Sequence, residues 1–243
     1  MSGVLDARER AGVLTLTLDR PTLGNALDET LVEALLTAVL DACGNEGLHT
    51  LVLRGAGRHF CTGFDLSDLA HQSDGDLLRR FVRVELLLAA LWHAPLRTVA
   101  LAQGRTFGAG ADLFACCDER IAHLGASFTF PGARFGLVLG TRRLAVRLGE
   151  SRALAGVTTG EVLTAEAALG AGLASAVIDT EVDAWQPDAL PPLVTDRATT
   201  AALKAATRPD QRDTDLAALV RSAARPGLKA RIVAYREAQT RRG

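Results

Sequence analysis

The residues best suited to chemistry gather in two glycine-bearing segments, Cys61–Asp65 and Gly108–Asp112. Each segment follows a short apolar run and a glycine turn, and glycine allows the backbone to come close to a bound group. The N–H groups in the first turn of a helix lack partners inside the helix and carry partial positive charge. One N–H group from each segment would polarise a carbonyl oxygen, and losing such a donor costs roughly 3–4 kcal/mol of transition-state stabilisation. The two segments are therefore predicted to line one active site.

Either segment alone would also fit tight packing at a strand-to-helix junction. Two other glycine motifs do not fit this sequence. A dinucleotide-binding loop needs a third glycine, and Leu113 stands where the spacing after Gly108 and Gly110 requires it. The nucleophile elbow of serine hydrolases ends in glycine, whereas the stretch that begins at Gly125 ends in Thr129. The pattern therefore indicates an oxyanion-binding role.

Repeated strand–turn–helix units must position these segments. Residues 13–18 alternate like a half-buried strand, and Asp28 is placed to cap the helix that follows. The pattern then predicts strands at 50–53 and 98–102, helices at 75–93 and from Gly108, a strand region from Ile121 and a last strand at 173–177. Residues 183–194 indicate a linker, and the chain from about 198 is predicted to be helical with breaks at Pro209 and Pro226. This order favours an α/β protein.

Composition narrows the class of protein. The chain has 243 residues, of which 48% are hydrophobic, and a formal net charge of −1. That balance indicates no nucleic-acid partner, and the pairs Arg79-Arg80 and Arg241-Arg242 are predicted to be solvated surface. The spacings of the four cysteines match no metal site, so no metal is expected. No segment resembles a signal peptide or a membrane span, so we expect no membrane contact and a cytoplasmic location.

Several segments, in the same order, resemble the enoyl-CoA hydratase/isomerase, or crotonase, superfamily. Leu18-Asp19-Arg20-Pro21 followed by Asn25-Ala26-Leu27 is similar to its N-terminal signature. Residues 55–66 resemble its first active-site segment, and residues 103–113 resemble its second. The later segments 117–122, 159–168 and 172–174 are similar as well. Together the similar segments lie within residues 13–178.

This resemblance implies a fold and a substrate. Members of the superfamily bind acyl-CoA thioesters, and their core is a spiral of ββα turns. We therefore expect an α/β fold in which residues 1–190 form the crotonase-like core with the CoA-thioester site. Residues 191–243 would form a C-terminal helical region that serves oligomerisation, and a homotrimer or hexamer is expected. Coenzyme A would be part of the substrate, and no separate cofactor is expected.

The resemblance also implies roles for individual residues. The N–H groups of Phe64 and Ala109 would form the oxyanion hole, and Asp112 would be the catalytic acid or base. Asp112 fits equally well as a structural carboxylate near a helix N-terminus, satisfied by free N–H groups. The substrate would be bound by parts of both glycine segments and of two further loops, namely Asn25, Ala26, Leu27, Gly63, Asp65, Leu66, Gly108, Pro131 and Gly132. Lys229 or Arg236, on the last helices, could meet the phosphates of CoA.

Two positions differ from the pattern that the superfamily uses for hydration. That reaction uses two glutamates, and here the first position is Asp112 and the second is Gly132. The loop at 136–143, where some relatives carry a later acid, has no carboxylate. Aspartate is one methylene shorter than glutamate, and a displacement of about 1 Å can cost on the order of a hundredfold in rate. Hydration by paired carboxylates is therefore expected to be impaired, whereas a proton shift beside the thioester needs only one base.

Other groups could replace the missing acid. Glu85 lies on a helix that borders the acyl pocket in this family, but an exposed helical glutamate is the more common case. Arg134 and Arg142 flank the emptied position, where an arginine could bind a substrate carboxylate, but surface ion pairs are the simpler expectation for them. The main prediction is an acyl-CoA lyase or isomerase of the enoyl-CoA hydratase/isomerase type. The alternatives are a degenerate relative that binds a CoA ester without chemistry, and an acyl-CoA hydrolase or decarboxylase.

Overall fold

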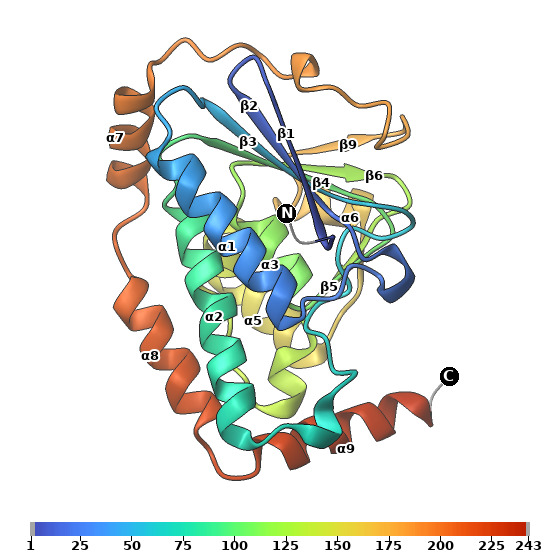
Figure 1. Cartoon of the computed structure of the whole chain (residues 1–243). Helices are drawn as coiled ribbons and strands as arrows, with labels where there is room; N and C mark the ends of the chain where they lie inside the picture. Colours follow the sequence, from blue (N-terminus) through green and yellow to red (C-terminus); the bar gives the residue numbers. More distant parts are fainter. Residues whose placement is uncertain (1–2, 242–243) are drawn as a thin grey trace.

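The computed structural model describes residues 3–241, and a six-stranded sheet with the strand order β1-β2-β3-β4-β6-β9 lies at its centre (Figure 1). β1 and β2 pair antiparallel, and all later neighbours in this sheet are parallel. The strands are β1 (Leu5–Arg10), β2 (Val13–Leu18), β3 (Thr50–Gly55), β4 (Arg97–Ala102), β6 (Glu119–His123) and β9 (Ala176–Ile178). Parallel neighbours need crossover connections, and helices supply them here.

A second, three-stranded sheet contains β5 (Arg105–Phe107), β7 (Ser127–Thr129) and β8 (Leu163–Thr164). β5 follows closely after β4, and β7 follows closely after β6. A long strand, a short strand and a helical segment therefore succeed one another twice, which confirms the expected spiral of ββα turns. This arrangement matters for the site because β5 leads directly into the second glycine segment.

Two long helices, α1 (Glu29–Gly44) and α2 (Asp74–Trp92), pack against each other and against the sheet (Figure 1). The Asp28 carboxylate accepts the Leu31 N–H at 2.8 Å, so the predicted cap of the first helix is confirmed. α2 begins with a reciprocal capping box between Ser73 and Asp76. The remaining helical segments are η1 (Pro21–Leu23), η2 (Leu69–His71), α3 (Ala109–Cys116), η3 (Pro131–Phe135), α4 (Thr141–Leu148), α5 (Glu150–Thr159), α6 (Ala165–Gly170), η4 (Pro187–Ala189), α7 (Arg197–Thr207), α8 (Arg212–Ala223) and α9 (Leu228–Thr240).

The main hydrophobic core fills the space between these helices and the sheet. Its members include Leu16 of β2, Leu35 of α1, Leu88 of α2 and Phe114 of α3, all fully buried. Burying one such side chain stabilises the fold by about 1.5–3 kcal/mol. α3 is buried along its whole length. The second glycine segment is therefore anchored in the core rather than on a loose surface loop.

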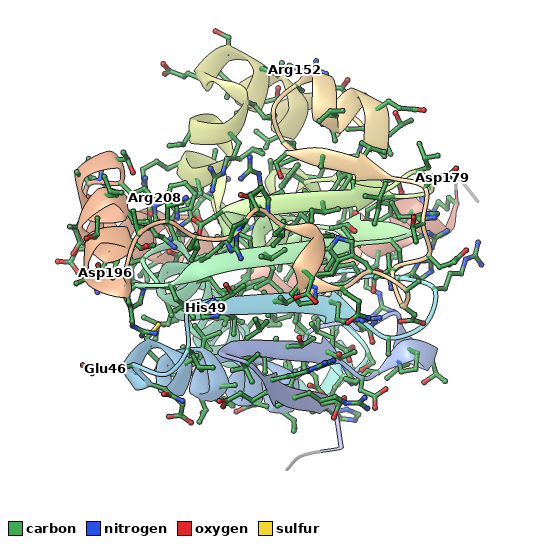
Figure 2. All side chains as sticks on the ribbon, turned by 90° about the horizontal axis from the view of Figure 1, so that it is seen from above. Glu46, His49, Arg152, Asp179, Asp196 and Arg208 are labelled. Atoms are coloured by element: carbon green, nitrogen blue, oxygen red, sulfur yellow. The ribbon has the colours of Figure 1, made fainter. Side chains whose placement is uncertain are left out.

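Asp118, directly after α3, connects the core to α7. It accepts hydrogen bonds from Lys204 at 2.9 Å and from Arg208 at 2.6 Å, and its other bonds cap the start of β4. The Arg208 guanidinium also lies 4.4 Å from the ring centroid of the buried Trp92. Asp196 and Arg208 mark the two ends of α7 in Figure 2, at the side of the sheet. Asp118 thus has a structural role, because it ties α7 to the start of β4.

Some predictions from the sequence need correction. β1 was not expected, because its mostly charged residues form an exposed edge strand without a clear apolar alternation. β6 begins at Glu119 rather than Ile121, and β9 covers 176–178 rather than 173–177. The breaks at Pro209 and Pro226 are confirmed, since α7, α8 and α9 end and begin around them. Among the described helices, none combines the length and apolar character needed to cross a membrane.

Candidate active site

The two glycine segments lie side by side, as the sequence predicted. A bridge pairs Cys61 with Thr106, and the Phe107 N–H donates to the Cys61 carbonyl oxygen at 3.0 Å. Gly63 has a φ of +100°, and a Cβ atom there would approach the Phe107 oxygen to 2.7 Å. Only glycine permits both this backbone angle and this close approach. Gly63 therefore allows the first segment to lie directly against the end of β5.

The N–H groups of Phe64 and Ala109 are both available to a ligand. Within residues 3–241, no protein acceptor receives either of them. Among the described residues, the Phe64 N–H is free because of the β-bridge between Phe64 and Leu27. Leu27 bonds to the Gly63 carbonyl oxygen and the Asp65 N–H, which point to one side of the segment, so the Phe64 N–H points to the other side. Ala109 is the first residue of α3, so its N–H has no acceptor in the helix. A Cβ atom on Gly63 would lie 3.6 Å from the Ala109 nitrogen, so the residue before Phe64 lies directly beside the Ala109 N–H group.

Arg80 fixes the position of Phe64, and the prediction that Arg80 is solvated surface is wrong. Its guanidinium lies 4.1 Å from the Phe64 ring centroid and donates to the Asp65 carbonyl oxygen at 2.9 Å. Phe81 stacks on the same ring, with centroids 4.1 Å apart. The sequence held a signal for this role, since position 80 lies between Leu77 and Phe81 on the buried stripe of α2.

The loop before α1 is tied to the first glycine segment by buried polar contacts. The fully buried Asn25 side chain donates to the carbonyl oxygens of Ala56 at 2.9 Å and His59 at 2.7 Å. The Arg20 guanidinium pairs with Asp65 at 2.9 Å and also donates to the Ala26 carbonyl oxygen. Asn25 and Asp65 therefore hold this loop in place, whatever further contact they make with a substrate.

Asp112 is a buried carboxyl group with an exposure of 5%. In the described part of the chain, no hydrogen bond or ion pair reaches its side chain. Burial raises the pKa of Asp112 well above its ordinary value, the nearby Glu85 carboxylate raises it further, and Arg143 opposes both effects. A raised pKa moves the carboxyl group towards neutral pH, where an acid–base catalyst works best.

Gly132 and Pro131 lie in η3, next to the second glycine segment. A Cβ atom on Gly108 would lie 3.7 Å from the Pro131 ring, so these predicted substrate residues are neighbours. Gly132 has room for a Cβ atom, which would make only an ordinary van der Waals contact, 3.7 Å from the Leu137 oxygen. The loop that follows, residues 136–140, contains no carboxylate and brings Gly140 against Asp112.

Glu85 is not the exposed helical residue that the sequence favoured. Its exposure is 2%, and it forms a two-armed ion pair with Arg143, at 2.5 and 3.1 Å. Arg142 forms an ion pair with Asp215 at 2.7 Å, but the pair is largely buried rather than on the surface as expected. Arg134 instead donates to the carbonyl oxygens of Thr159 and Gly160, at 3.4 and 3.3 Å. The sequence could not identify the Glu85–Arg143 pair, because its members are 58 positions apart and lie on different helices.

The residues near the predicted CoA-binding stretch are joined to α9. Arg236 donates to the Leu66 carbonyl oxygen at 2.9 Å, and Lys229 donates to the Ala70 carbonyl oxygen at 2.7 Å. Ile232 of α9 is buried in a second apolar cluster with Phe81 and with residues after the first glycine segment. The last helix thus packs over the loop that follows Phe64.

Cys61 is the only cysteine within the two glycine segments. It is fully buried, and burial raises the pKa of its thiol to about 12. Its carbonyl oxygen and Cβ atom lie against Gly110, where any larger residue would collide with them. Cys61 therefore packs the two segments together and does not supply a thiolate.

The model of the enoyl-CoA hydratase/isomerase family matches residues 8–221. The chain belongs to the enoyl-CoA hydratase/isomerase family. Among its relatives is the protein named "Probable enoyl-CoA hydratase echA6" of Mycobacterium bovis, which is 37% identical over 180 residues, or 73% of this chain and 70% of that protein. The 2,3-dehydroadipyl-CoA hydratase of Escherichia coli is 31% identical over 185 residues, which cover 75% of this chain and 71% of that protein.

A solved structure from Bordetella parapertussis, described as an enoyl-CoA hydratase/isomerase, is similar to this chain over nearly its whole length. Its TM-score is 0.89 at 42% identity, with 96% of this chain and 98% of that chain covered. Acyl-CoA thioesters are the substrates of the enoyl-CoA hydratase/isomerase family, so this chain is an acyl-CoA thioester-processing enzyme. The comparisons do not favour the alternatives of a CoA-ester binder without chemistry, a hydrolase or a decarboxylase.

Proposed function

We propose that this enzyme moves a proton at the carbon next to the thioester carbonyl of an acyl-CoA, through an enolate, and so acts as an isomerase. The observation that carries the proposal is that, within residues 3–241, the N–H groups of Phe64 and Ala109 have no protein acceptor. Ala109 begins α3, the helix that also carries Asp112, and Phe64 lies directly beside this helix start. An oxyanion hole and one buried carboxyl group are the parts that such a proton shift requires.

In the proposed reaction, the thioester oxygen accepts hydrogen bonds from the N–H groups of Phe64 and Ala109. The Asp112 carboxylate takes a proton from the α-carbon, the C–H electron pair forms a new carbon–carbon π bond, and the carbonyl π pair moves onto the oxygen. The two N–H groups stabilise the negative charge that develops there. Asp112 then returns the proton to the α-carbon or, in an unsaturated chain, to the γ-carbon, which moves the double bond.

We favour a proton shift over hydration because hydration needs a second group to activate water. Gly132 supplies no side chain at the position where the family's second glutamate is expected, and the loop 136–140 adds no carboxylate. Glu85 is a poor substitute, because both of its oxygens are engaged by Arg143. Two relatives are named hydratases, whereas we propose a proton shift for this enzyme.

The remaining assignments also belong to the proposal. The thioester and its CoA part would contact Asn25, Ala26, Leu27, Gly63, Asp65, Leu66, Gly108, Pro131 and Gly132. Coenzyme A enters as part of the substrate, and the chemistry needs no separate cofactor. We further propose a cytoplasmic homotrimer or hexamer, with residues 1–190 as the catalytic core and residues 191–243 as a helical region for assembly.

The test is hydrogen exchange at the α-carbon of a saturated acyl-CoA in deuterated water, followed by mass spectrometry. The wild-type enzyme is expected to exchange α-hydrogens and to convert a 3-enoyl-CoA into its 2-enoyl isomer. Asp112→Asn should reduce both rates by a hundredfold or more, roughly the contribution of a positioned base, whereas the exposed control Asp188→Asn should not. Absence of exchange with short and medium chains alike would overturn the proposal, and so would exchange that survives in Asp112→Asn.

A further inference from the structure

A buried group of charged side chains lies beside Asp112 and comes from three helices that are distant in sequence. α2 contributes Glu85, α4 contributes Arg142 and Arg143, and α8 contributes Asp215. The side chains of Arg143 and Glu85 are 1% and 2% exposed, and that of Asp215 is 10% exposed. Charges at such depth are costly unless each is paired.

Arg143 is held from two sides. Its terminal nitrogens bind both oxygens of Glu85, and one of them also lies 3.2 Å from Asp215. Arg142 binds both oxygens of the same Asp215 carboxylate, at 2.7 to 3.1 Å. Two arginines and two carboxylates therefore compensate one another, and Asp112 is left as a third carboxyl group with no cation of its own among the described residues.

The two charged groups that face Asp112 act on it in opposite directions. After burial itself, Glu85 on α2 raises the pKa of Asp112, and Arg143 on α4 lowers it. On its own helix, Asp112 faces the uncharged thiol of Cys116. The loop 136–140, which packs against its carboxyl group, contains no charged residue. The balance between Glu85 and Arg143 is therefore the only charge control within this part of the structure.

We propose that Glu85 and Arg143 are positioning residues of the reaction: Glu85, assisted by Asp215, keeps Arg143 paired away from Asp112, so that Asp112 stays free to exchange a proton with the substrate. This inference rests on the proposed function only for the role of Asp112 in catalysis. Without Glu85, the buried guanidinium would keep only its contact with Asp215, and Asp112 would become a further carboxylate available to neutralise it. An ion pair of that kind would hold Asp112 ionised and make it a weak base.

The experiment measures the ionisation of Asp112 directly, by carbon NMR of the full chain with ¹³C-labelled aspartate carboxyl groups, assigned with Asp112→Asn. Glu85→Gln removes a negative charge and frees Arg143, so the pKa of Asp112 should fall by about one unit or more. Arg143→Gln removes the opposing cation, so the pKa of Asp112 should rise. Asp215→Asn should lower it in the same direction as Glu85→Gln but by less, because Asp215 is more exposed and contacts Arg143 with one oxygen only.

A matched control breaks an ion pair elsewhere. Glu161 pairs with Arg152 at 2.8 Å on the surface, and Arg152 lies at the edge of the molecule in Figure 2. Glu161→Gln should therefore leave the titration of Asp112 unchanged. If Glu85→Gln or Arg143→Gln fails to fold, Asp215→Asn still decides the sign of the effect. A pKa of Asp112 that moves in the same direction in the glutamate and arginine variants, or does not move in any of them, would overturn the inference.

The pH dependence of α-hydrogen exchange separates this inference from the proposed function. If Asp112 is the base, the midpoint of the exchange rate should move with its titration, and the rate above that midpoint should fall in Glu85→Gln because a weaker base removes the proton. A titration that shifts as expected while the exchange profile stays fixed would reject the catalytic role of Asp112. The role of Glu85 and Arg143 in setting its ionisation would then still stand.

Discussion

Gly140 lies so close to Asp112 that a Cβ atom at position 140 would overlap the Oδ1 atom of the carboxyl group. The backbone of Gly140 has a φ of +67°, which residues other than glycine adopt with strain. The loop that lacks a catalytic acid therefore still shapes the site. It places bare backbone against the one carboxyl group that remains.

The first prediction compares two glycines of this region. Gly140→Ala should destabilise the fold by at least about 1–2 kcal/mol, from the backbone angle alone, and should also slow α-hydrogen exchange by displacing Asp112. Gly132→Ala should change stability by no more than about 0.5 kcal/mol, because its Cβ atom would meet only ordinary contacts. Urea denaturation gives both values. Combining Gly140→Ala with Asp112→Ala should recover part of the loss, and strict additivity of the two changes would show that they do not touch.

The second prediction removes one oxyanion-hole donor without changing the fold. Ala109→Pro replaces an N–H that has no protein acceptor, at the first position of α3, where proline is well tolerated. The rate of α-hydrogen exchange should fall by roughly 10²–10³-fold. Glu150→Pro is the matched control, since it also follows a glycine cap at the first position of a helix but lies exposed on α5. Equal activity in the two proline variants would exclude Ala109 from the oxyanion hole.

The third prediction concerns the neighbours Arg79 and Arg80. Arg80→Met removes the cation above the Phe64 ring and the donor to the Asp65 carbonyl, so the Phe64 N–H should lose its fixed position. We expect kcat to fall about tenfold or more with little change in KM, as for an interaction used in the transition state. Arg79→Met breaks only an exposed pair with Glu29 and should leave the kinetics as they are. Steady-state kinetics that cannot tell the two variants apart would count against this role of Arg80.

The fourth prediction follows from the raised pKa of Asp112. In acid, below the ordinary carboxyl range, Asp112 is uncharged in both the folded and the unfolded chain. As the pH rises, the unfolded chain ionises first, so the folded state of the wild type loses stability by up to about 1.4 kcal/mol per pH unit until the folded pKa is reached. Asp112→Asn lacks this loss. The thermal midpoint of Asp112→Asn should therefore rise relative to that of the wild type as the pH increases above the ordinary carboxyl range, and a constant difference from there to neutral pH would contradict the raised pKa.

Local patterns in the sequence were enough for most of the scaffold. Alternation along 13–18 and the Asp28 cap predicted β2 and the start of α1, because both signals lie within a few residues of each other. β5 and β7 have three residues each, too few for a period to be recognised. The same limit hides β8, which has two.

The candidate site divides in the same way. The closeness of the two glycine segments was predictable, since the chain reaches them after β3 and β4, which are neighbouring parallel strands of the six-stranded sheet. Arg80 and Glu85 were misjudged, because a charged residue within a helix is commonly exposed. The position of Arg80 on the apolar stripe indicated burial but did not identify its partner. The contacts of both residues come from Phe64 and Arg143, which only the folded chain brings to them. The catalytic and binding roles given to Phe64, Ala109 and Asp112 stay predictions until they are measured.

The burial of Cys61 affects whether a reactive substrate could inactivate the enzyme by covalent modification. An α,β-unsaturated thioester is an electrophile. A cysteine thiolate of the protein within reach would add to its double bond and so become alkylated. Cys61 sits three residues before Phe64, but its thiol is fully buried and has a pKa of about 12, so almost none of it is ionised at neutral pH. The side chain that packs the two glycine segments together is thereby protected from alkylation, even though it lies beside the place where the reactive group would be held.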